Sequence, residues 1–285
     1  MENLTSNAQP EQYLDFLLEY LACPIDNAIL LTAVRNPDGQ VVALKSEDRQ
    51  YQVIDDVPCM LPEWGGSRDG GQVLWRELQD TAWQEYQNGD EGVFSAGDDP
   101  LGLGVGQIIG QTGAGLFLDV GCGPLPLPGY MAASNDRVSW IGIDPFFGDA
   151  ARRFPFVQAV GEYLPFRPQV FDGVLYAGTI DHVIDPSRSL ERTRKVIKPR
   201  GKLFVWYDVR RVDPRYVVWK MVRRLGFAWR YNEAHQWAFS HKALRALLGR
   251  AGFAVEEVIP LCERYCPDYP KCSDPTGFLA VARCI

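Results

Sequence analysis

Two apolar runs near the middle of the chain each carry a carboxylate where a strand would end. Asp119 lies in LFLDVGCGP, just before Gly121 and Gly123, and Asp144 closes VSWIGID. Glycines after a strand let the backbone approach a ligand closely, and an acid about 20 residues later can accept hydrogen bonds from both ribose hydroxyls. The two runs therefore predict a crevice for a nucleotide-like ligand, with Asp144 at its ribose.

The residues after the glycines narrow the kind of ligand. A dinucleotide site would have a third glycine near position 126, but this position is Pro126, in a PLPLPG run that delays the next helix. LDVGCGP instead resembles the first motif of class I S-adenosylmethionine-dependent methyltransferases. The resemblance implies that Gly121, Cys122 and Gly123 wrap the amino-acid part of the cofactor, with Asp119 orienting its ammonium. A glycine turn without a ligand is the alternative.

Further segments extend this resemblance along the chain. AVGEYLPF resembles the family stretch that contacts the adenine, although Val160 stands where an aspartate is common. The resemblance implies cofactor contacts from Pro145, Glu162 and Tyr163, or from backbone amides near Glu162. A plain surface turn is the alternative for Glu162.

The segment GTIDHVIDP, which starts at Gly178, resembles the part of the family that lines the meeting point of cofactor and substrate. Methyl transfer is an in-line displacement, so an enzyme must align the reactants and, for a hydroxyl or carbon acceptor, remove a proton. Imidazole titrates near neutral pH, which makes His182 the candidate base, with Asp181 beside it. Packing of His182 over the cofactor is the alternative.

The elements that position these residues alternate between strand and helix from residue 116 onward. This order predicts a doubly wound, mostly parallel sheet with helices on both faces. The resemblance implies the seven-stranded Rossmann-like methyltransferase fold. The predicted strands are 116–120, 138–143, 171–177, 202–208, 254–259 and 278–282, and the predicted helices are 187–197, 214–225 and 241–251.

Two other segments surround the predicted crevice. Residues 73–86 form an amphipathic pattern, and a helix there would cover the cofactor cleft. The insert 207–236 lies where relatives have a substrate lid, and its basic, aromatic stretch could hold an anionic ligand. A second glycine-rich run, from Gly102 to Gly110, follows an Asp-Asp-Pro sequence rather than a strand, so we do not expect it to bind phosphate.

The first 64 residues form a separate small unit. A helical pattern over 11–20 precedes strand candidates at 29–34, 40–44 and 51–54. Residues 17–62 resemble a small α+β zinc-ribbon family that activates methyltransferases. However, Asp26 replaces the second cysteine, and the 45–50 stretch has no cysteine pair, so Cys23 lacks its partners. Because a tetrahedral zinc site needs four ligands, we expect a ribbon without metal.

Composition limits the class of protein. The chain has 285 residues, seven cysteines and a formal net charge of −7, and its N-terminus has no pattern of a secretion signal. We expect a cytoplasmic protein with two domains, residues 1–64 and 72–285. The acidic charge favours a small-molecule or saccharide-type acceptor over nucleic acid. An RNA methyltransferase and a non-catalytic cofactor-binding scaffold are the alternatives, and the sequence leaves the oligomeric state open.

Overall fold

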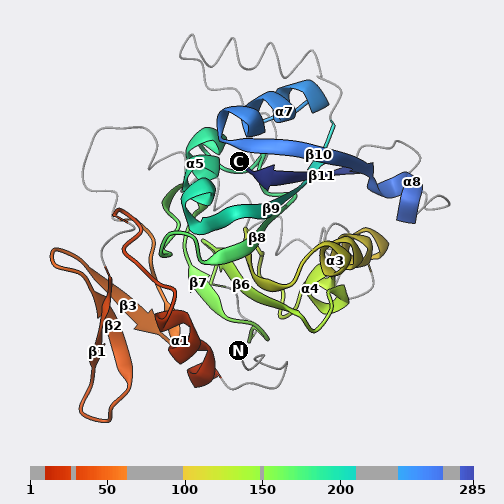
Figure 1. Ribbon diagram of the computed structural model, residues 1–285. Helices are drawn as coiled ribbons and strands as arrows, with labels where there is room; N and C mark the ends of the chain where they lie inside the picture. The colour runs from red at the N-terminus through yellow and green to blue at the C-terminus, as the bar shows by residue number, and fades with distance from the viewer. Residues whose placement is uncertain (1–9, 27–29, 63–98, 148–150, 210–236, 266–276) are drawn as a thin grey trace, which may run out of the picture.

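The computed structural model describes residues 10–26, 30–62, 99–147, 151–209, 237–265 and 277–285 (Figure 1). The predicted helices 73–86 and 214–225 and most of the insert 207–236 lie outside these ranges. None of the helices in the described ranges has both the length and the apolar character that a bilayer crossing requires.

The N-terminal part consists of one helix and a four-stranded antiparallel sheet with the order β1-β2-β3-β4. The elements are α1 (Pro10–Leu18), β1 (Thr32–Arg35), β2 (Val41–Lys45), β3 (Gln50–Ile54) and β4 (Val57–Pro58). Asp55 and Asp56 form the turn between β3 and β4, with φ angles of 48° and 61°. Left-handed conformations at both positions match the twist of the two strands, which explains the tight hairpin.

The main sheet has seven strands in the order β10-β11-β9-β8-β5-β6-β7. The strands are β5 (Gly115–Val120), β6 (Val138–Asp144), β7 (Phe156–Gln158), β8 (Phe171–Ala177), β9 (Ile197–Asp208), β10 (Phe253–Pro260) and β11 (Gly277–Cys284). β11 is antiparallel to both of its neighbours, and the pairs among β5 to β9 are parallel. The predicted mostly parallel, seven-stranded sheet is therefore confirmed, and β7 is the strand that our sequence reading left out.

Helices cover both faces of this sheet, as a doubly wound fold requires (Figure 1). Leu118 and Val174 belong to the core cluster shared with α5 (Pro186–Val196) and α7 (His241–Arg250). Phe117 and Leu175 belong to the opposite cluster, with α3 (Pro100–Thr112) and α4 (Gly129–Ala133). Neighbouring residues of a strand point to opposite faces of the sheet. One face therefore packs against α5 and α7, and the other packs against α3 and α4. The short helices η1 (Gly161–Tyr163) and α8 (Leu261–Tyr265) complete the described elements.

The second glycine-rich run lies on α3, a helix that the sequence reading did not predict. Gly102, Gly106 and Gly110 recur every fourth residue, so they share one face of the helix. A Cβ atom on Gly106 would lie 2.4 Å from the carbonyl oxygen of Tyr130 in α4. These glycines therefore let two helices pack closely. Asp99 caps the helix by accepting from the backbone N–H of Gly102 at 2.9 Å.

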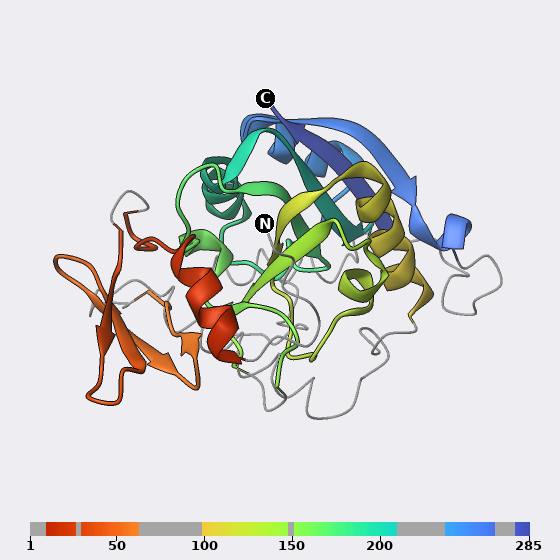
Figure 2. The same ribbon diagram turned by 60° about the horizontal axis from the view of Figure 1, so that its bottom comes forward.

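The N-terminal part is joined to the outer strand of the main sheet. Cys59 pairs with Gln158 in a parallel bridge, and the Met60 N–H donates to the Gln158 carbonyl at 2.8 Å. Leu21 and Phe166 form a second, antiparallel bridge. Leu17 and Met60 belong to the same buried cluster as residues of the main sheet. In Figure 2, α1 and the small sheet accordingly lie beside the strands of the main domain.

Candidate active site

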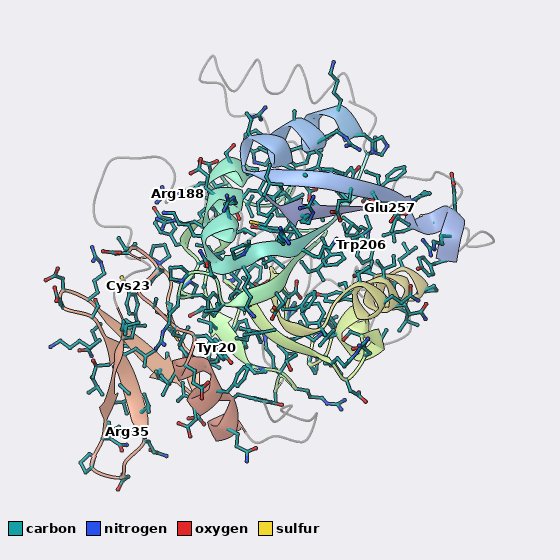
Figure 3. The ribbon with its side chains drawn as sticks, in the orientation of Figure 1. Tyr20, Cys23, Arg35, Arg188, Trp206 and Glu257 are labelled. Atoms are coloured by element: carbon teal, nitrogen blue, oxygen red, sulfur yellow. The ribbon has the colours of Figure 1, made fainter. Side chains whose placement is uncertain are left out.

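The predicted site residues gather at the carboxyl ends of β5, β6 and β8. These three parallel strands are neighbours in the sheet, so the loops that follow them lie at one edge. The Gly121 N–H donates to the carbonyl of Ile143 at 2.8 Å, and the Gly178 N–H donates to the carbonyl of Trp206, labelled in Figure 3, at 3.1 Å. The backbone thus links each loop to a neighbouring strand. In open α/β sheets this edge forms the ligand crevice.

Asp119 is a fully buried carboxylate with one oxygen left for a ligand. Its Oδ2 accepts a hydrogen bond of 2.6 Å from the hydroxyl of Tyr130, and its Oδ1 has no hydrogen-bond donor among the described residues. Burial raises the pKa of Asp119 to about 7, the Tyr130 hydroxyl lowers it, and the nearby charge of Asp144 raises it further. An ammonium at Oδ1 would satisfy this oxygen and favour the ionised form.

At Gly121, the loop after Asp119 has room only for backbone. Gly121 and Gly123 have φ angles of +79° and +67°, in the left-handed region that favours glycine. A Cβ atom on Gly121 would lie 2.2 Å from the side chain of Thr179. The Cys122 thiol between them is buried, and burial raises its pKa well above the usual range. Cys122 can therefore contribute its backbone to a ligand, but not an exposed thiolate.

Asp144 ends β6 and is held by the backbone on both of its oxygens. Oδ2 accepts from the N–H of Gly123 and Oδ1 accepts from the N–H of Phe146, each at 2.8 Å. Burial raises the pKa of Asp144 to about 6, although both amides lower it. Pro145 follows, and its carbonyl accepts a hydrogen bond of 2.9 Å from Gln158. The glycine loop and the end of β6 are thus joined through one carboxylate.

Glu162 and Tyr163 lie in η1, which is attached to the start of α5. The buried Glu162 accepts hydrogen bonds at Oε1 from the backbone N–H of Ile184, at 2.8 Å, and of Asp185, at 3.2 Å. Burial raises the pKa of Glu162 despite these amides. The Arg188 guanidinium lies 4.1 Å from the centre of the Tyr163 ring. Glu162 is therefore not the plain surface turn that was the sequence alternative.

Asp181 and His182 lie in the turn between β8 and α5. Asp181 Oδ1 and His182 Nε2 are 3.8 Å apart, and their side chains are 17% and 35% exposed. Trp237 fixes this turn with two bonds, because its backbone N–H donates to the Asp181 carbonyl at 3.1 Å and its indole N–H to the Val183 carbonyl at 2.9 Å. The turn is thus rigidly attached to the segment that leads into α7.

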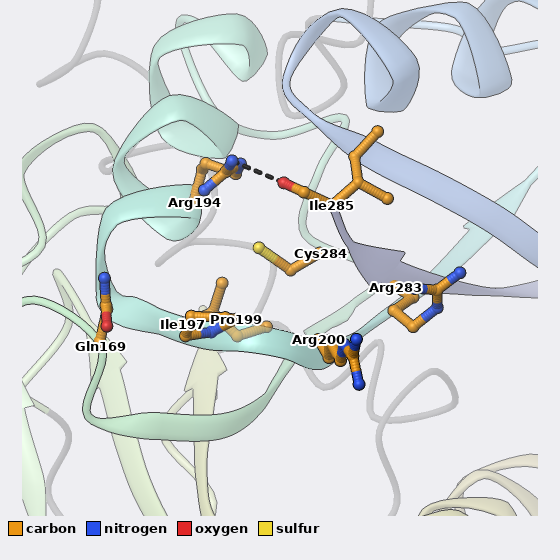
Figure 4. A pocket seen from close by; sticks show the side chains of 8 residues that line it. All are labelled: Gln169, Arg194, Ile197, Pro199, Arg200, Arg283, Cys284 and Ile285. Atoms are coloured by element: carbon orange, nitrogen blue, oxygen red, sulfur yellow. Dashed lines mark hydrogen bonds between the residues drawn. The ribbon is translucent and has the colours of Figure 1, made fainter.

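One open cavity lies away from these residues. Figure 4 shows it beside the start of β9 and the end of β11, at the edge of the sheet opposite to the crevice. None of the predicted site residues lines it. Its lining consists of Gln169, Arg194, Ile197, Pro199, Arg200, Arg283, Cys284 and Ile285.

Fold and site together define an α/β protein with a nucleotide-type crevice at the carboxyl edge of a doubly wound sheet. Residues 111–258 match the family model described as a methyltransferase domain, and because this match covers over half of the chain, the chain belongs to that family. The family uses S-adenosylmethionine. Asp119 Oδ1, to which no residue in the described ranges donates, fits the ammonium of this cofactor, and the close approach of the backbone at Gly121 fits its amino-acid part.

Curated relatives share only part of their length with this chain. An uncharacterized methyltransferase of Mycolicibacterium vanbaalenii is 32% identical over 45% of this chain and 55% of its own. A ubiquinone/menaquinone biosynthesis C-methyltransferase of Haemophilus ducreyi is 27% identical over 35% of this chain and 33% of its own. A ubiquinone biosynthesis O-methyltransferase of Xylella fastidiosa is 30% identical over 31% of this chain and 39% of its own. The chain thus spans about half or less of these relatives.

A solved structure supports the fold. The 1,6-didemethyltoxoflavin-N1-methyltransferase of Burkholderia thailandensis, with bound 1,6-didemethyltoxoflavin and S-adenosylhomocysteine, superimposes with a TM-score of 0.54 at 15% sequence identity. The match covers 83% of this chain and 96% of that chain.

Proposed function

We propose that this chain transfers the methyl group of S-adenosylmethionine to a small-molecule or saccharide-type acceptor. The observation that carries the proposal is Asp119, a fully buried carboxylate with one oxygen that no described residue satisfies. A buried carboxylate with a free oxygen is costly unless a donor reaches it. The cofactor ammonium is such a donor, and the family match makes this cofactor the expected ligand.

The remaining cofactor contacts follow from the loops around Asp119. Gly121, Cys122 and Gly123 would hold the amino-acid part with their backbone, and Asp144 would accept from the ribose hydroxyls. Pro145, Glu162, Tyr163 and Gly178 would surround the rest of the cofactor. Because the Oε1 atom of Glu162 already binds two backbone amides, we assign the adenine contact in this region to its Oε2 or to backbone groups of η1.

When bound, the cofactor supplies an electrophilic methyl group on a sulfonium. The chain must then hold the acceptor in line with it and accept a proton where the acceptor is a hydroxyl or carbon acid. We assign this proton transfer to His182, which is partly exposed in the turn after β8. Asp181, whose Oδ1 lies 3.8 Å from Nε2 of His182, is the partner that we assign to this base.

The proposed acceptor class rests on the net charge of this chain and on the functions for which its relatives are named. The net charge of −7 opposes broad contact with nucleic-acid phosphates. Two curated relatives are named for ubiquinone biosynthesis, and the Burkholderia structure contains a small heterocyclic acceptor. A small molecule is therefore favoured over RNA.

We further propose that the chain has two domains. Residues 1–64 form a zinc-ribbon-like domain without zinc, and residues 72–285 form the catalytic domain with a lid at 207–236. We also propose that the protein works in the cytoplasm. For the ribbon, the support is the buried Cys23 thiol, which lies 3.3 Å from the Tyr51 hydroxyl. Among the described residues, no group of three or more potential metal ligands comes together. A hydroxyl beside Cys23 is compatible with a packed, metal-free ribbon.

The test is calorimetric titration of the full chain with S-adenosylmethionine and S-adenosylhomocysteine. We expect micromolar binding of either ligand, and Asp144→Ala should weaken it strongly. Asp136→Ala, in the loop before β6, is the control for loss of a carboxylate. Absence of binding to wild type would refute the proposal, whereas binding without methyl transfer to any acceptor would favour the non-catalytic cofactor-binding scaffold. With binding established, methyl transfer to RNA but not to small metabolites would overturn the acceptor class.

A further inference from the structure

Arg152 lies between β6 and β7 and contacts both loops of the cofactor crevice. Its Nη2 donates to the carbonyl oxygen of Gly123 at 2.9 Å and to that of Phe146 at 3.1 Å, and its Nη1 donates to that of Phe147 at 3.0 Å. The guanidinium also lies over the Phe156 ring, with Cζ 3.6 Å from the ring centre. Four contacts to other residues therefore fix its position.

Two residues whose carbonyls accept from Arg152, Gly123 and Phe146, also donate their backbone N–H to Asp144. The N–H groups of Gly123 and Phe146 donate to the two carboxylate oxygens, while the carbonyls of these residues accept from the guanidinium. Each residue is thus held at its N–H by a carboxylate and at its C=O by a guanidinium. Hydrogen bonds to charged groups are shorter and stronger than those between neutral groups, so this closed arrangement is well determined.

We propose that Arg152 is a positioning residue for the cofactor. It fixes the Gly123 peptide and the Asp144 carboxylate in the orientation that the ribose hydroxyls require, and it does so through the backbone rather than by touching the methyl acceptor. The inference rests on the proposed function, because it assumes that Asp144 receives the ribose. It adds a residue for which the sequence motifs give no signal.

The charge of Arg152 gives this role a measurable signature. Within the described ranges, the charged or titratable groups that interact with Asp144 are Asp119 and Cys122, from β5 and its loop, and Arg152. Burial raises the pKa of Asp144 to about 6, and the two amides and the positive charge of Arg152 oppose this rise. Removal of the guanidinium should raise that pKa further. The carboxylate then becomes protonated at a higher pH, and cofactor affinity is lost earlier on acidification.

The neighbouring Arg153 provides a matched control. Its side chain is exposed, and the hydrogen bond to the Pro126 carbonyl comes from its backbone, which any substitution keeps. The experiment is titration of the full chain with S-adenosylhomocysteine from about pH 5.5 to about pH 8.5, a range that brackets the expected carboxylate titration. The proteins are wild type, Arg152→Met, Arg152→Lys and Arg153→Met.

Arg152→Met is expected to weaken binding by about tenfold to a hundredfold at neutral pH, because several charge-assisted bonds are lost. It should also move the midpoint of the pH profile to higher pH. Arg152→Lys keeps the charge but not the planar fork, so its midpoint should stay near that of wild type while its affinity falls. Arg153→Met should match wild type in both respects.

The outcomes distinguish failure of the proposed function from failure of the positioning role of Arg152. If wild type binds S-adenosylhomocysteine at no pH, the proposed function fails. If wild type binds and Arg152→Met retains its affinity, or loses affinity with no shift of the midpoint, the positioning role of Arg152 is wrong and the proposed function stands. If the methionine variant does not fold, the lysine variant decides: weaker binding at an unchanged melting temperature supports the role, and unchanged affinity overturns it.

Discussion

Asp119→Asn should stabilise the cofactor-free protein, and this effect should grow with pH. Burial is the main reason that the pKa of Asp119 rises from 3.8 to about 7 in the folded chain. Unfolding returns the carboxyl to its ordinary pKa, so between these two values the folded state binds the extra proton. The free energy of unfolding of wild type therefore falls as pH rises through this window. Above pH 7 the folded state bears the full cost of the ionised, buried Asp119 carboxylate.

The size of the effect follows from the pKa of about 7. Between pH 5 and pH 7, Asp119 is protonated in the folded state and ionised in the unfolded state. Each of these about two pH units lowers the free energy of unfolding by about 1.36 kcal/mol, so the total loss is about 2.7 kcal/mol. An asparagine has no such cost. The stabilisation of Asp119→Asn relative to wild type should therefore be about 2–3 kcal/mol larger at pH 8 than at pH 5.

Urea unfolding of wild type and Asp119→Asn at the two pH values measures this difference directly. Taking the difference between proteins at each pH cancels the titration of groups that they share. Asp38→Asn, in the exposed hairpin turn after β1, controls for the loss of one negative charge. The reasoning would be refuted if the stabilisation of Asp119→Asn relative to wild type changed by less than about 0.5 kcal/mol between the two pH values. Such a change is within the error of additivity for independent sites. The same variant should bind S-adenosylmethionine more weakly, since an amide cannot pair with its ammonium.

Three further predictions concern the loops and the N-terminal domain. Gly121→Ala should reduce S-adenosylhomocysteine binding below detection in calorimetry, because φ at this position is +79° and a Cβ would lie 2.2 Å from Thr179. If the variant bound with wild-type affinity, this loop geometry would be contradicted. Trp237→Phe removes the indole donor to Val183 and should lower the free energy of unfolding in urea by about 1 kcal/mol. It should reduce kcat by a larger factor than it raises KM. An unchanged kcat would show that the turn after β8 does not need this hydrogen bond. Dialysis against a chelator should leave the melting temperature unchanged, and a drop would mean that Cys23 does bind metal.

The central strands could be predicted from sequence because they are buried on both faces. The runs ending at Asp119 and Asp144 are almost entirely apolar, and a parallel sheet requires this pattern. β7 was missed because it has only three residues, Phe156–Gln158, and follows a proline. α3 was missed for a different reason: its glycines suggested a loop, although Asp99 and Pro100 form a typical N-terminal helix signal.

The network around the carboxylates could not be predicted from sequence. Tyr130 is 11 residues from Asp119, and Arg152 is 29 residues from Gly123, so no local spacing connects either pair. Tyr130 reaches Asp119 because α4 packs on the sheet, and Arg152 reaches Gly123 because the loops after β5 and β6 lie side by side. The motifs therefore predicted that Asp119 and Asp144 lie at strand ends, but not which groups hold the two carboxylates in place.

The junction between β4 and β7 has a consequence for how the protein unfolds. β7 would be the outermost strand of the main sheet, and residues Cys59 and Met60 cover part of its edge. A chain cut after the N-terminal domain would leave that edge unpaired and would expose apolar residues such as Phe166, which is fully buried in the intact protein. Unpaired edges invite association between molecules. The N-terminal part and the main sheet should therefore melt in one cooperative transition, and the rest of the chain should aggregate when it is produced without the N-terminal part.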